Sequence, residues 1–426
     1  MGRLSTEFDV LVVSNFGRGH WLATDLADKR LKVGLVDLSE RFARWTPEDR
    51  EGPFGFYKSE GLQATQLERL TEEDYTESCP QGFVVWLKSG PIETQGPLAQ
   101  FSFRKEGFPE AYIQYLNQAE NLKSDARQNL LGQIRDDDFS KTWLVHLCHQ
   151  LASTRFHLNS RGSQQGAPLP VFADHMFRRA SRRGFADSLA WCESKGVQVF
   201  QGAEILDLGI QDRRLESMEV RASINGVLRA KQVVWALTSK ETSRLDSRFL
   251  EKLYQSDAVE PTWSWVRFRY SIQDNGATQS LPPRFVLLQD IYSPWTHENM
   301  MLVQRTVRSD QYDVWVRIPS LQRFQQAYLD QLSKTMLGLI RERLPETPCE
   351  LLAPPQEYLY PENELGPSCY PVYEPSDLEQ LHTKNLKNVF WDGPEYWERS
   401  DWNFQLSHHA ELSQQVQAQL EKEKPR

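Results

Sequence analysis

Cysteine is scarce in this sequence and forms none of the close pairs that metal or redox sites use. Five cysteines are dispersed over 426 residues, and no two of them stand in a C-x-x-C spacing. An odd, scattered set argues against a disulfide framework and is typical of a protein in a reducing compartment. We therefore predict a cytoplasmic location. The cysteines are Cys79, Cys148, Cys192, Cys349 and Cys369.

Long apolar runs and an excess of positive charge are missing as well. No stretch approaches the ~18 consecutive apolar residues of a membrane-spanning helix, and we expect no cleaved leader at the start. Lys and Arg number 49 against 58 Asp and Glu, which gives a net charge of −9. Because binding to a phosphate backbone requires a basic face, we expect no nucleic acid partner and no membrane span.

The sequence has the length and the element order of two interleaved domains. Apolar strands alternate with amphipathic helices at both ends of the chain and in its middle. Longer strands, typical of antiparallel sheet, lie between these parts. This order predicts an α/β domain that is interrupted twice by an α+β domain. We place the first domain at 1–58, 170–258 and 375–426, and the inserted domain at 59–169 and 259–374.

The stretch VVSNFGRGHW lies between a strand and a helix near the start of the chain. A dinucleotide-binding protein has its G-x-G-x-x-G motif at this place, where glycines allow a tight turn and close approach of the pyrophosphate. Here the three glycine positions hold Ser14, Phe16 and Gly19. Gly19 keeps the close packing of helix and strand, and Gly17 and Arg18 can grip a phosphate at the helix N-terminus. Alternatively, the two glycines only shape the turn.

Residues 196–237 resemble a segment of the flavoprotein amine oxidases, the superfamily that includes protoporphyrinogen oxidase and phytoene desaturase. In that family a helix ends on a glycine, a strand follows with an apolar residue that touches adenine, and a hairpin leads to a strand ending near the flavin. Gly196, Ile205 and Gly226 stand at the corresponding points. The resemblance implies a discontinuous FAD-type Rossmann domain with an inserted α+β substrate domain. It also implies FAD as cofactor and oxidation of an apolar or amine substrate between the domains.

The same resemblance implies further cofactor contacts. Asp37, at the end of the second strand, corresponds to the acid that bonds the adenosine ribose. Arg44 corresponds to the arginine of a Gly-Gly-Arg stretch along the flavin phosphates, although Ala43 replaces its second glycine. Asp392 and Gly393 correspond, in reversed order, to a Gly-Asp pair whose acid bonds the ribityl chain. The implied cofactor-binding residues are Ser14, Phe16, Gly17, Gly19, Asp37, Arg44, Ile205, Asp392 and Gly393.

Two functions of different classes remain open. The first is an FAD-dependent oxidoreductase, which Gly19 and Asp37 favour. The second is a flavin-free descendant of the same fold that serves as a binding or scaffolding protein. Phe16 favours the second, because we expect its ring to occupy the volume of a pyrophosphate. The segment 394–404 also favours it, since its aromatic and charged residues can fill the flavin space, although they can also form a reshaped pocket wall.

Other side chains with catalytic chemistry have simpler explanations. His146 and His149 share one face of a predicted helix, but no nearby acid completes a metal site, and we expect ordinary helix residues. His408 and His409 are adjacent, so we expect them to point apart and not to chelate together. No Ser-His-Asp, Cys-His or paired-carboxylate arrangement can be derived from spacing. We therefore name no catalytic residue and predict no metal.

Two further patterns concern ligands or partners. Trp263 and Trp265 alternate onto one face of a predicted strand, and we expect them to line a cleft in the inserted domain. A small-molecule substrate or a protein partner would bind there. Four arginines within 178–183 can bind an anion at the domain junction, but we favour a solvated face that pairs with some of the many acids.

Overall fold

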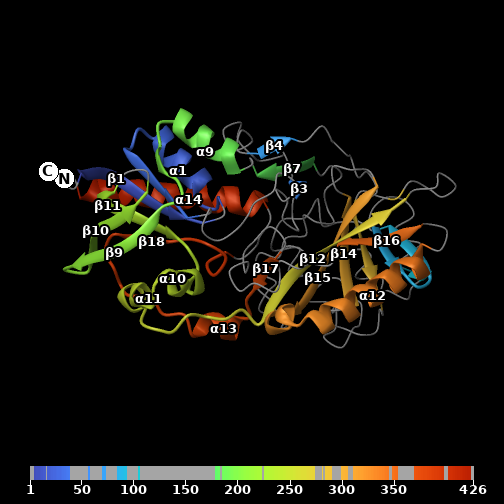
Figure 1. Ribbon diagram of the computed structural model, residues 1–426. Coiled ribbons are helices and arrows are strands. Elements are labelled where there is room, and N and C mark those ends of the chain that lie inside the picture. Colours follow the sequence, from blue (N-terminus) through green and yellow to red (C-terminus); the bar gives the residue numbers. More distant parts are fainter. Residues whose placement is uncertain are drawn as a thin grey trace.

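The chain forms two lobes, and each lobe is built on its own sheet (Figure 1). The computed structural model describes part of the chain. The described residues are 4–15, 17–38, 56–57, 70–72, 84–93, 104–105, 178–182, 185–222, 225–273, 281, 284–289, 299–305, 310–344, 348–353, 369–397 and 402–423.

The first sheet has seven strands in the order β8-β2-β1-β11-β10-β9, and β18 pairs with β11 as well. The strands β8, β2, β1, β11 and β18 run parallel, whereas β10 is antiparallel to β9 and β11. These strands come from well-separated stretches of the chain, as the sequence predicts for an interrupted α/β domain. Their bounds are β1 Leu4–Ser14, β2 Val33–Asp37, β8 Gln198–Phe200, β9 Glu204–Gln211, β10 Arg214–Arg221, β11 Gly226–Ala236 and β18 Val389–Trp391.

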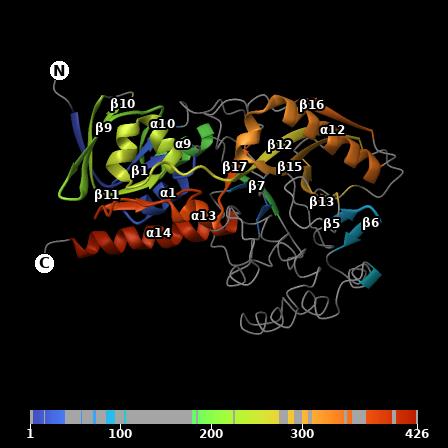
Figure 2. The same cartoon turned by 90° about the horizontal axis from the view of Figure 1, so that it is seen from below.

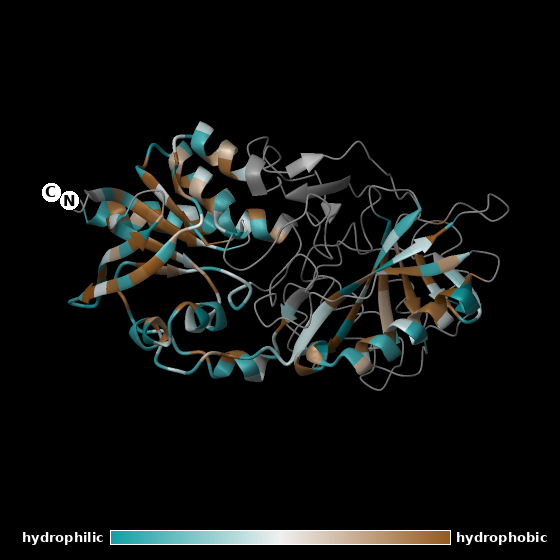
Figure 3. Cartoon of the chain, in the orientation of Figure 1, coloured by the Kyte–Doolittle hydropathy of each residue, from teal (hydrophilic) through white to brown (hydrophobic). Residues whose placement is uncertain are grey.

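Helices cover both faces of this sheet, which explains why its central strands are almost continuously apolar. On one face, Leu22 and Leu26 of α1 lie one helical turn apart and share a core with Val10 and Val12 of β1. Figure 2 shows α14 running along the same lobe, and Figure 3 shows apolar strands between more polar helix surfaces. The helices of that face are α1 His20–Asp28, α9 Phe185–Ser194 and α14 Trp402–Lys422. Those of the other are α10 Ser239–Leu245 and α11 Ser247–Leu253.

The second sheet has eight strands in the order β16-β12-β15-β14-β13-β5-β6, and β17 also pairs with β12. α12 (Gln326–Arg343) covers one of its faces, because Leu329, Met336 and Ile340 recur at helical spacing and join the core of the sheet. The bounds are β5 Val84–Leu87, β6 Gly90–Glu93, β12 Trp263–Ile272, β13 Arg284–Leu288, β14 Met300–Arg305, β15 Gln311–Pro319, β16 Cys349–Ala353 and β17 Cys369–Val372. Smaller elements are β3 Phe56–Tyr57, β4 Leu70–Glu72, β7 Arg178–Arg182, η3 Ser320–Phe324 and α13 Pro375–Glu379.

Local turns of the first lobe have the backbone geometry that their positions require. Gly196 follows α9 with φ +85°, as expected for a helix-ending glycine. The hairpin between β9 and β10 turns at Asp212 and Arg213, and both have positive φ, as a two-residue turn requires. Residues 178–182 form β7, which pairs with β3 and β4. The pair His146 and His149 lies outside the described residues, and the domain boundaries stay a prediction.

The described residues show no helix typical of membrane insertion and no side-chain cluster typical of metal binding. No helix among them is both long enough and apolar enough to cross a membrane. No group of three or more His, Cys, Asp or Glu side chains among them is placed to hold a metal ion. Cys192 and Cys349 are buried free thiols. The cytoplasmic location stays a prediction.

Candidate functional site at the carboxyl edge of the first sheet

The implied cofactor residues gather where the parallel strands of the first sheet end. Ser14 is the last residue of β1 and pairs in register with Asp37, the last residue of β2, and with Ala236, the last residue of β11. Asp392 directly follows β18, the neighbour of β11. In open α/β sheets this edge is where nucleotides bind. The structure therefore brings together residues that the sequence placed in one site.

Gly19 holds α1 tightly against β1. A Cβ atom built on Gly19 would lie 2.7 Å from Cγ1 of Val12 and 3.0 Å from Cβ of Ser14. Real Cβ atoms do not approach other atoms so closely, so a side chain would push the helix from the strand. Gly17 has φ +69°, a conformation that suits glycine. Both glycines shape the turn, and Phe16 between them and the strand lies outside the described residues.

The backbone N–H groups of the turn are used within the turn itself. N–H groups at a helix N-terminus are the donors that a pyrophosphate normally takes. At three successive positions these donors have an acceptor in this chain, and the side chain of Ser14 supplies one of them. Arg18 N donates to Asn15 O (3.2 Å), Gly19 N to Ser14 Oγ (2.9 Å), and His20 N to Gly17 O (3.2 Å).

Arg18 folds back onto an acid of the same lobe. Its Nη2 atom donates to both carboxylate oxygens of Glu241, at 2.6 and 2.5 Å, and the two side chains are only 5% and 3% exposed. Asn15 donates to Glu241 as well, at 2.7 Å. Glu241 also accepts from the backbone of Thr238, so that it closes a capping box at the start of α10. The charge of Arg18 is therefore used to fix α10 to the turn, and phosphate binding by Gly17 and Arg18 stays a prediction.

Asp37 is bound by the first residue of α1. His20 Nε2 lies 3.1 Å from Asp37 Oδ1, and His20 Nδ1 lies 2.5 Å from the hydroxyl oxygen of Ser188 on α9. Neither His20 nor Asp37 is exposed, and Ser188 is 2% exposed. This is a Ser-His-Asp alignment that spacing in the sequence did not indicate. Its burial leaves no access for a substrate, so the three side chains tie α1, β2 and α9 together.

Asp392 is the centre of a second buried network. Its Oδ1 atom accepts from the backbone N–H of Gly393 at 2.8 Å and from the indole of Trp397 at 2.7 Å. His408 Nε2 lies 3.2 Å from Oδ1, and His409 Nε2 lies 3.0 Å from Oδ2. Burial by itself raises the pKa of Asp392, but His409 and His408 hold it well below its usual range. The two histidines were expected to point apart, whereas the structure places the Nε2 atoms of both within 3.2 Å of one carboxylate.

Glu395 lies buried between the two networks and has an unusual pKa. The backbone N–H of Ser239 lies 3.0 Å from each carboxylate oxygen, and the Ser239 hydroxyl donates to Oε1 at 2.6 Å. Burial raises the pKa of Glu395 to about 8; the bonds from Ser239 and the charge of Arg18 oppose this, whereas Glu241 adds to it. The carboxyl group of Glu395 therefore changes its protonation state near neutral pH, with a pKa of about 8.

Aromatic rings complete this edge of the sheet. Trp397 is 1% exposed and meets the ring of His409 edge to face, with 6.3 Å between ring centres. Trp21 of α1 meets the same histidine at 6.2 Å. Residues 394–397, the described start of the segment 394–404, thus pack into the lobe. Among the two roles that the sequence left open, these contacts favour a segment that fills space.

The remaining implied residues have structural surroundings. Ile205 on β9 is 6% exposed and belongs to the core on the α10 and α11 side of the sheet. Gly393 turns the chain after β18 with φ +116°, which glycine adopts without strain. Arg44 lies outside the described residues.

FAD fits these residues poorly in the way that the resemblance implies. Three N–H groups of the turn, the carboxylate of Asp37 and the carboxylate of Asp392 already have partners within the chain. Releasing a buried group from such a partner costs about 1–3 kcal/mol each. The groups that would bond the pyrophosphate, the ribose and the ribityl chain are therefore committed elsewhere.

Trp263 and Trp265 lie on one face of β12, and the alternate residues Val266, Phe268 and Tyr270 join the core under α12. The indole of Trp263 donates to Glu374 at 3.0 Å, and the guanidinium of Arg317 lies over its ring at 5.6 Å. The guanidinium of Arg267 lies 6.0 Å from the ring of Trp315 in the same way. This face of the second sheet therefore alternates indoles with cations. Its place in a cleft stays a prediction.

Comparison with known proteins supports the fold and goes no further. No family model matches this sequence, and no curated protein matches it. Solved structures do match. A geranylgeranyl bacteriochlorophyll reductase-like protein from Thermoplasma acidophilum is 11% identical with a TM-score of 0.50, over 98% of this chain and 80% of that chain.

Putrescine oxidase gives similar values. Its wild type bound to putrescine is 12% identical with a TM-score of 0.50, over 97% of this chain and 100% of that chain. A double mutant made to redesign its cofactor binding is 11% identical with a TM-score of 0.53 over the same shares. At such identities the likeness shows the fold alone. It confirms the predicted α/β class with an FAD-type Rossmann domain, a fold that is compatible with FAD.

Proposed function

We propose that this chain is a flavin-free member of the FAD-type fold and serves as a binding protein. The observation that carries the proposal is the contact between Asp37 and His20, both fully buried. The acid that would bond the ribose is held by the helix that would cradle the pyrophosphate. A ribose could compete for it only by opening the packing of α1 against β1.

The buried polar side chains at the carboxyl edge of the first sheet are further support. Arg18 and Glu241 bridge the turn to α10, Glu395 accepts from Ser239 at the start of α10, and Trp397 donates to Asp392. A pair of buried ions is costly to desolvate and is strongly destabilising to break. Opening this network to admit a cofactor would therefore be costly, which supports the flavin-free alternative.

The second sheet supplies the surface that we assign to ligand contact. Trp263, Trp265 and Trp315 alternate with Arg267 and Arg317 on the face opposite α12. Apart from Trp263 these side chains are at most 7% exposed, and Asp313 lies 3.8 Å from Arg267, so a ligand would have to displace what covers them. Indoles and guanidinium groups together recognise planar or anionic groups. A small molecule of that chemistry is the partner we propose for this face.

Gly19 favours a second candidate function, FAD-dependent oxidation of an apolar or amine substrate. Its contact with Val12 keeps the helix and strand at the close approach that dinucleotide sites use. That function would require Asp37 and the turn donors to exchange their internal partners for the cofactor.

The flavin content of the purified protein separates the two candidates. We expect a colourless protein whose denatured supernatant contains no flavin, and we expect none to be retained after incubation with FAD and gel filtration. Stoichiometric flavin, released only on denaturation, would contradict the proposal and support the oxidoreductase.

A further inference from the structure

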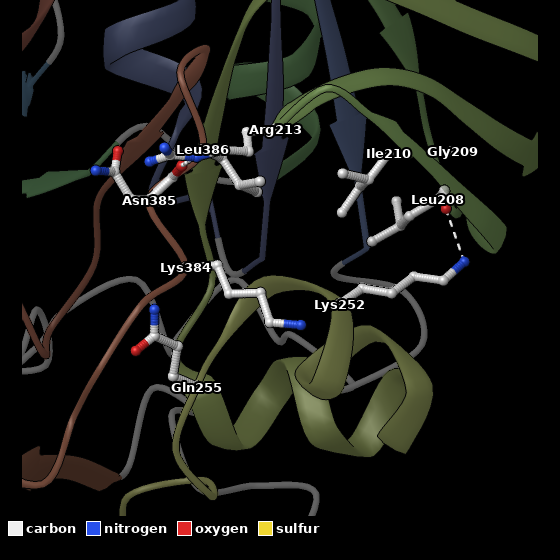
Figure 4. Close-up of a pocket in the computed structure, with 9 residues that line it drawn as sticks. All are labelled: Leu208, Gly209, Ile210, Arg213, Lys252, Gln255, Lys384, Asn385 and Leu386. Atoms are coloured by element: carbon white, nitrogen blue, oxygen red, sulfur yellow. Dashed lines mark hydrogen bonds between the residues drawn. The ribbon is translucent and has the colours of Figure 1, made fainter.

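A separate cavity of about 730 Å³ lies on the first lobe (Figure 4). It is formed by the β9–β10 hairpin, by α11 and by the segment 384–386 that precedes β18. None of its lining residues belongs to the network at the carboxyl edge of the sheet. Its size is that of pockets for small organic molecules.

The cavity combines an apolar floor with a cationic rim. Leu208, Ile210 and Leu386 supply the apolar surface, and Leu208 is 1% exposed. Arg213, Lys252 and Lys384 bring three positive charges to the rim, on a chain whose net charge is −9. The amide side chains of Gln255 and Asn385 add polar groups.

These cations are only partly neutralised. Lys252 Nζ donates to Asp207 Oδ1 at 2.6 Å and to the carbonyl of Leu208 at 2.7 Å. Lys384 Nζ donates to the backbone carbonyl of Glu251, and Arg213 Nε donates to that of Asn385 at 3.0 Å. A carbonyl group removes no charge. Within the described part of the chain, Lys252 forms an ion pair with Asp207, and no carboxylate lies within ion-pair distance of Arg213 or Lys384.

The backbone holds these groups in place before any ligand arrives. The N–H of Lys387 donates to the carbonyl of Arg213 at 2.8 Å, which fixes the hairpin turn to the segment before β18. The N–H of Lys384 donates to the carbonyl of Leu253 at 2.8 Å, which fixes that segment to the end of α11. A site whose groups are already positioned loses less entropy on binding.

We propose that this cavity binds a small organic anion, with its carboxylate or phosphate at Lys384 and its apolar body on Leu208, Ile210 and Leu386. The ammonium group of Lys384 bonds the anionic oxygens, Arg213 and Lys252 add positive charge at a greater distance, and the apolar floor excludes water from the rest of the ligand. The proposal concerns a site apart from the cofactor edge and holds whether or not the protein binds FAD.

The first test uses two fluorescent probes of similar shape, anilinonaphthalene sulfonate and the uncharged phenylnaphthylamine. We expect saturable binding of the anionic probe to the wild type, and a dissociation constant about tenfold higher or more for Lys384→Gln. Lys384→Arg should retain binding. Lys195→Gln is the matched control, because Lys195 follows α9 on the opposite face of the sheet. The uncharged probe should show no difference between the variants.

A second variant keeps the test independent of the contacts of Lys384. Gln255 is an exposed residue of the rim, and Gln255→Glu adds a repelling charge without disturbing the core. We expect it to weaken binding of the anionic probe at least as much as Lys384→Gln does. Anionic-probe binding that is unchanged in both variants would overturn the proposal, as would equal losses for the uncharged probe.

Displacement of the anionic probe distinguishes the two kinds of anion. Displacement by benzoate alone assigns the site to carboxylates, displacement by phenyl phosphate alone assigns it to phosphate esters, and displacement by both assigns it to organic anions in general. Displacement by neither would overturn the proposal.

Discussion

His20 Nε2 lies 3.1 Å from Asp37 Oδ1, and neither side chain is exposed to solvent. The two residues mark the start of the first helix and the end of the second strand of the lobe. In a dinucleotide site of this fold, the acid at this strand end faces the ribose. Here Asp37 faces the first residue of α1 instead. The ion pair between Arg18 and Glu241 also ties the turn before α1 to α10.

Asp37→Ala tests whether this contact stabilises the fold. The variant removes a buried partner of His20, and we expect the free energy of unfolding to fall by about 1–3 kcal/mol. His20→Ala should cost a similar amount, and the double variant should cost less than the two single costs added. Urea unfolding measures all three.

The matched control for this cycle is Asp28→Ala on the same helix. Asp28 lies 3.9 Å from Lys195, and both are partly exposed, so we expect a change of about 1 kcal/mol or less. Costs at Asp37 and His20 that are small and strictly additive would show that the two side chains are not coupled.

Glu395 gives the stability of the protein a pH dependence. Burial raises its pKa to about 8 from a usual value of 4.5, so between these values the folded chain binds more protons than the unfolded chain. The free energy of unfolding should therefore fall as the pH rises through this window, by roughly 3–5 kcal/mol in total from this group. Below about pH 4.5 the stabilising contribution of Glu395 is fully present, and above about pH 8 the free energy of unfolding loses no more from this group.

Glu395→Gln is the variant that isolates this effect. It retains a hydrogen-bonding side chain without a titrating proton, so we expect its unfolding free energy to lose this part of the pH dependence. Denaturant unfolding at intervals between pH 5 and pH 9, on the order of one pH unit apart, measures both proteins. Parallel curves for wild type and variant would contradict the assignment.

Gly19→Ala tests the close approach of α1 to β1. The added Cβ would lie 2.7 Å from Val12 Cγ1, and we expect a loss of about 1–3 kcal/mol from overpacking. Gly338 on α12 is the matched control, because a Cβ there meets nothing within 4 Å. Gly338→Ala should stabilise the protein by about 0.4–1 kcal/mol. Thermal unfolding measures the stability of both variants. Equal changes in stability for Gly19→Ala and Gly338→Ala would contradict the tight packing at Gly19.

The sequence predicted the parts of the fold that depend on local pattern. Strand and helix periodicity placed β1, α1 and β2, and the position of Gly19 between them predicted its packing against the strand. The alternation of Trp263 and Trp265 likewise placed both on one face of β12, because a strand turns each residue by half a turn.

The partners of the site residues could not be predicted in the same way. Glu241 lies 223 residues from Arg18, and Ser188 lies 168 residues from His20, so no spacing rule connects them. A His directly after Gly19 is the local signal in the sequence for a partner of Asp37.

The prediction that His408 and His409 point apart failed for a different physical reason. Adjacent helix residues do point apart, which predicts that His408 and His409 cannot share a metal. A carboxylate, however, has two oxygens and accepts bonds from several sides, so Asp392 reaches both rings. The rule for chelation does not exclude a shared acceptor.

Titration of FAD into the purified wild type by calorimetry tests the central claim most directly. The account predicts no measurable heat of binding at micromolar protein, because the ribose acceptor and the turn donors are committed within the chain. Phe16→Gly, tested in parallel, should recover binding only in part, since Asp37 remains bound to His20. Tight stoichiometric binding of FAD by the wild type would contradict the account and establish that the cofactor displaces these internal partners.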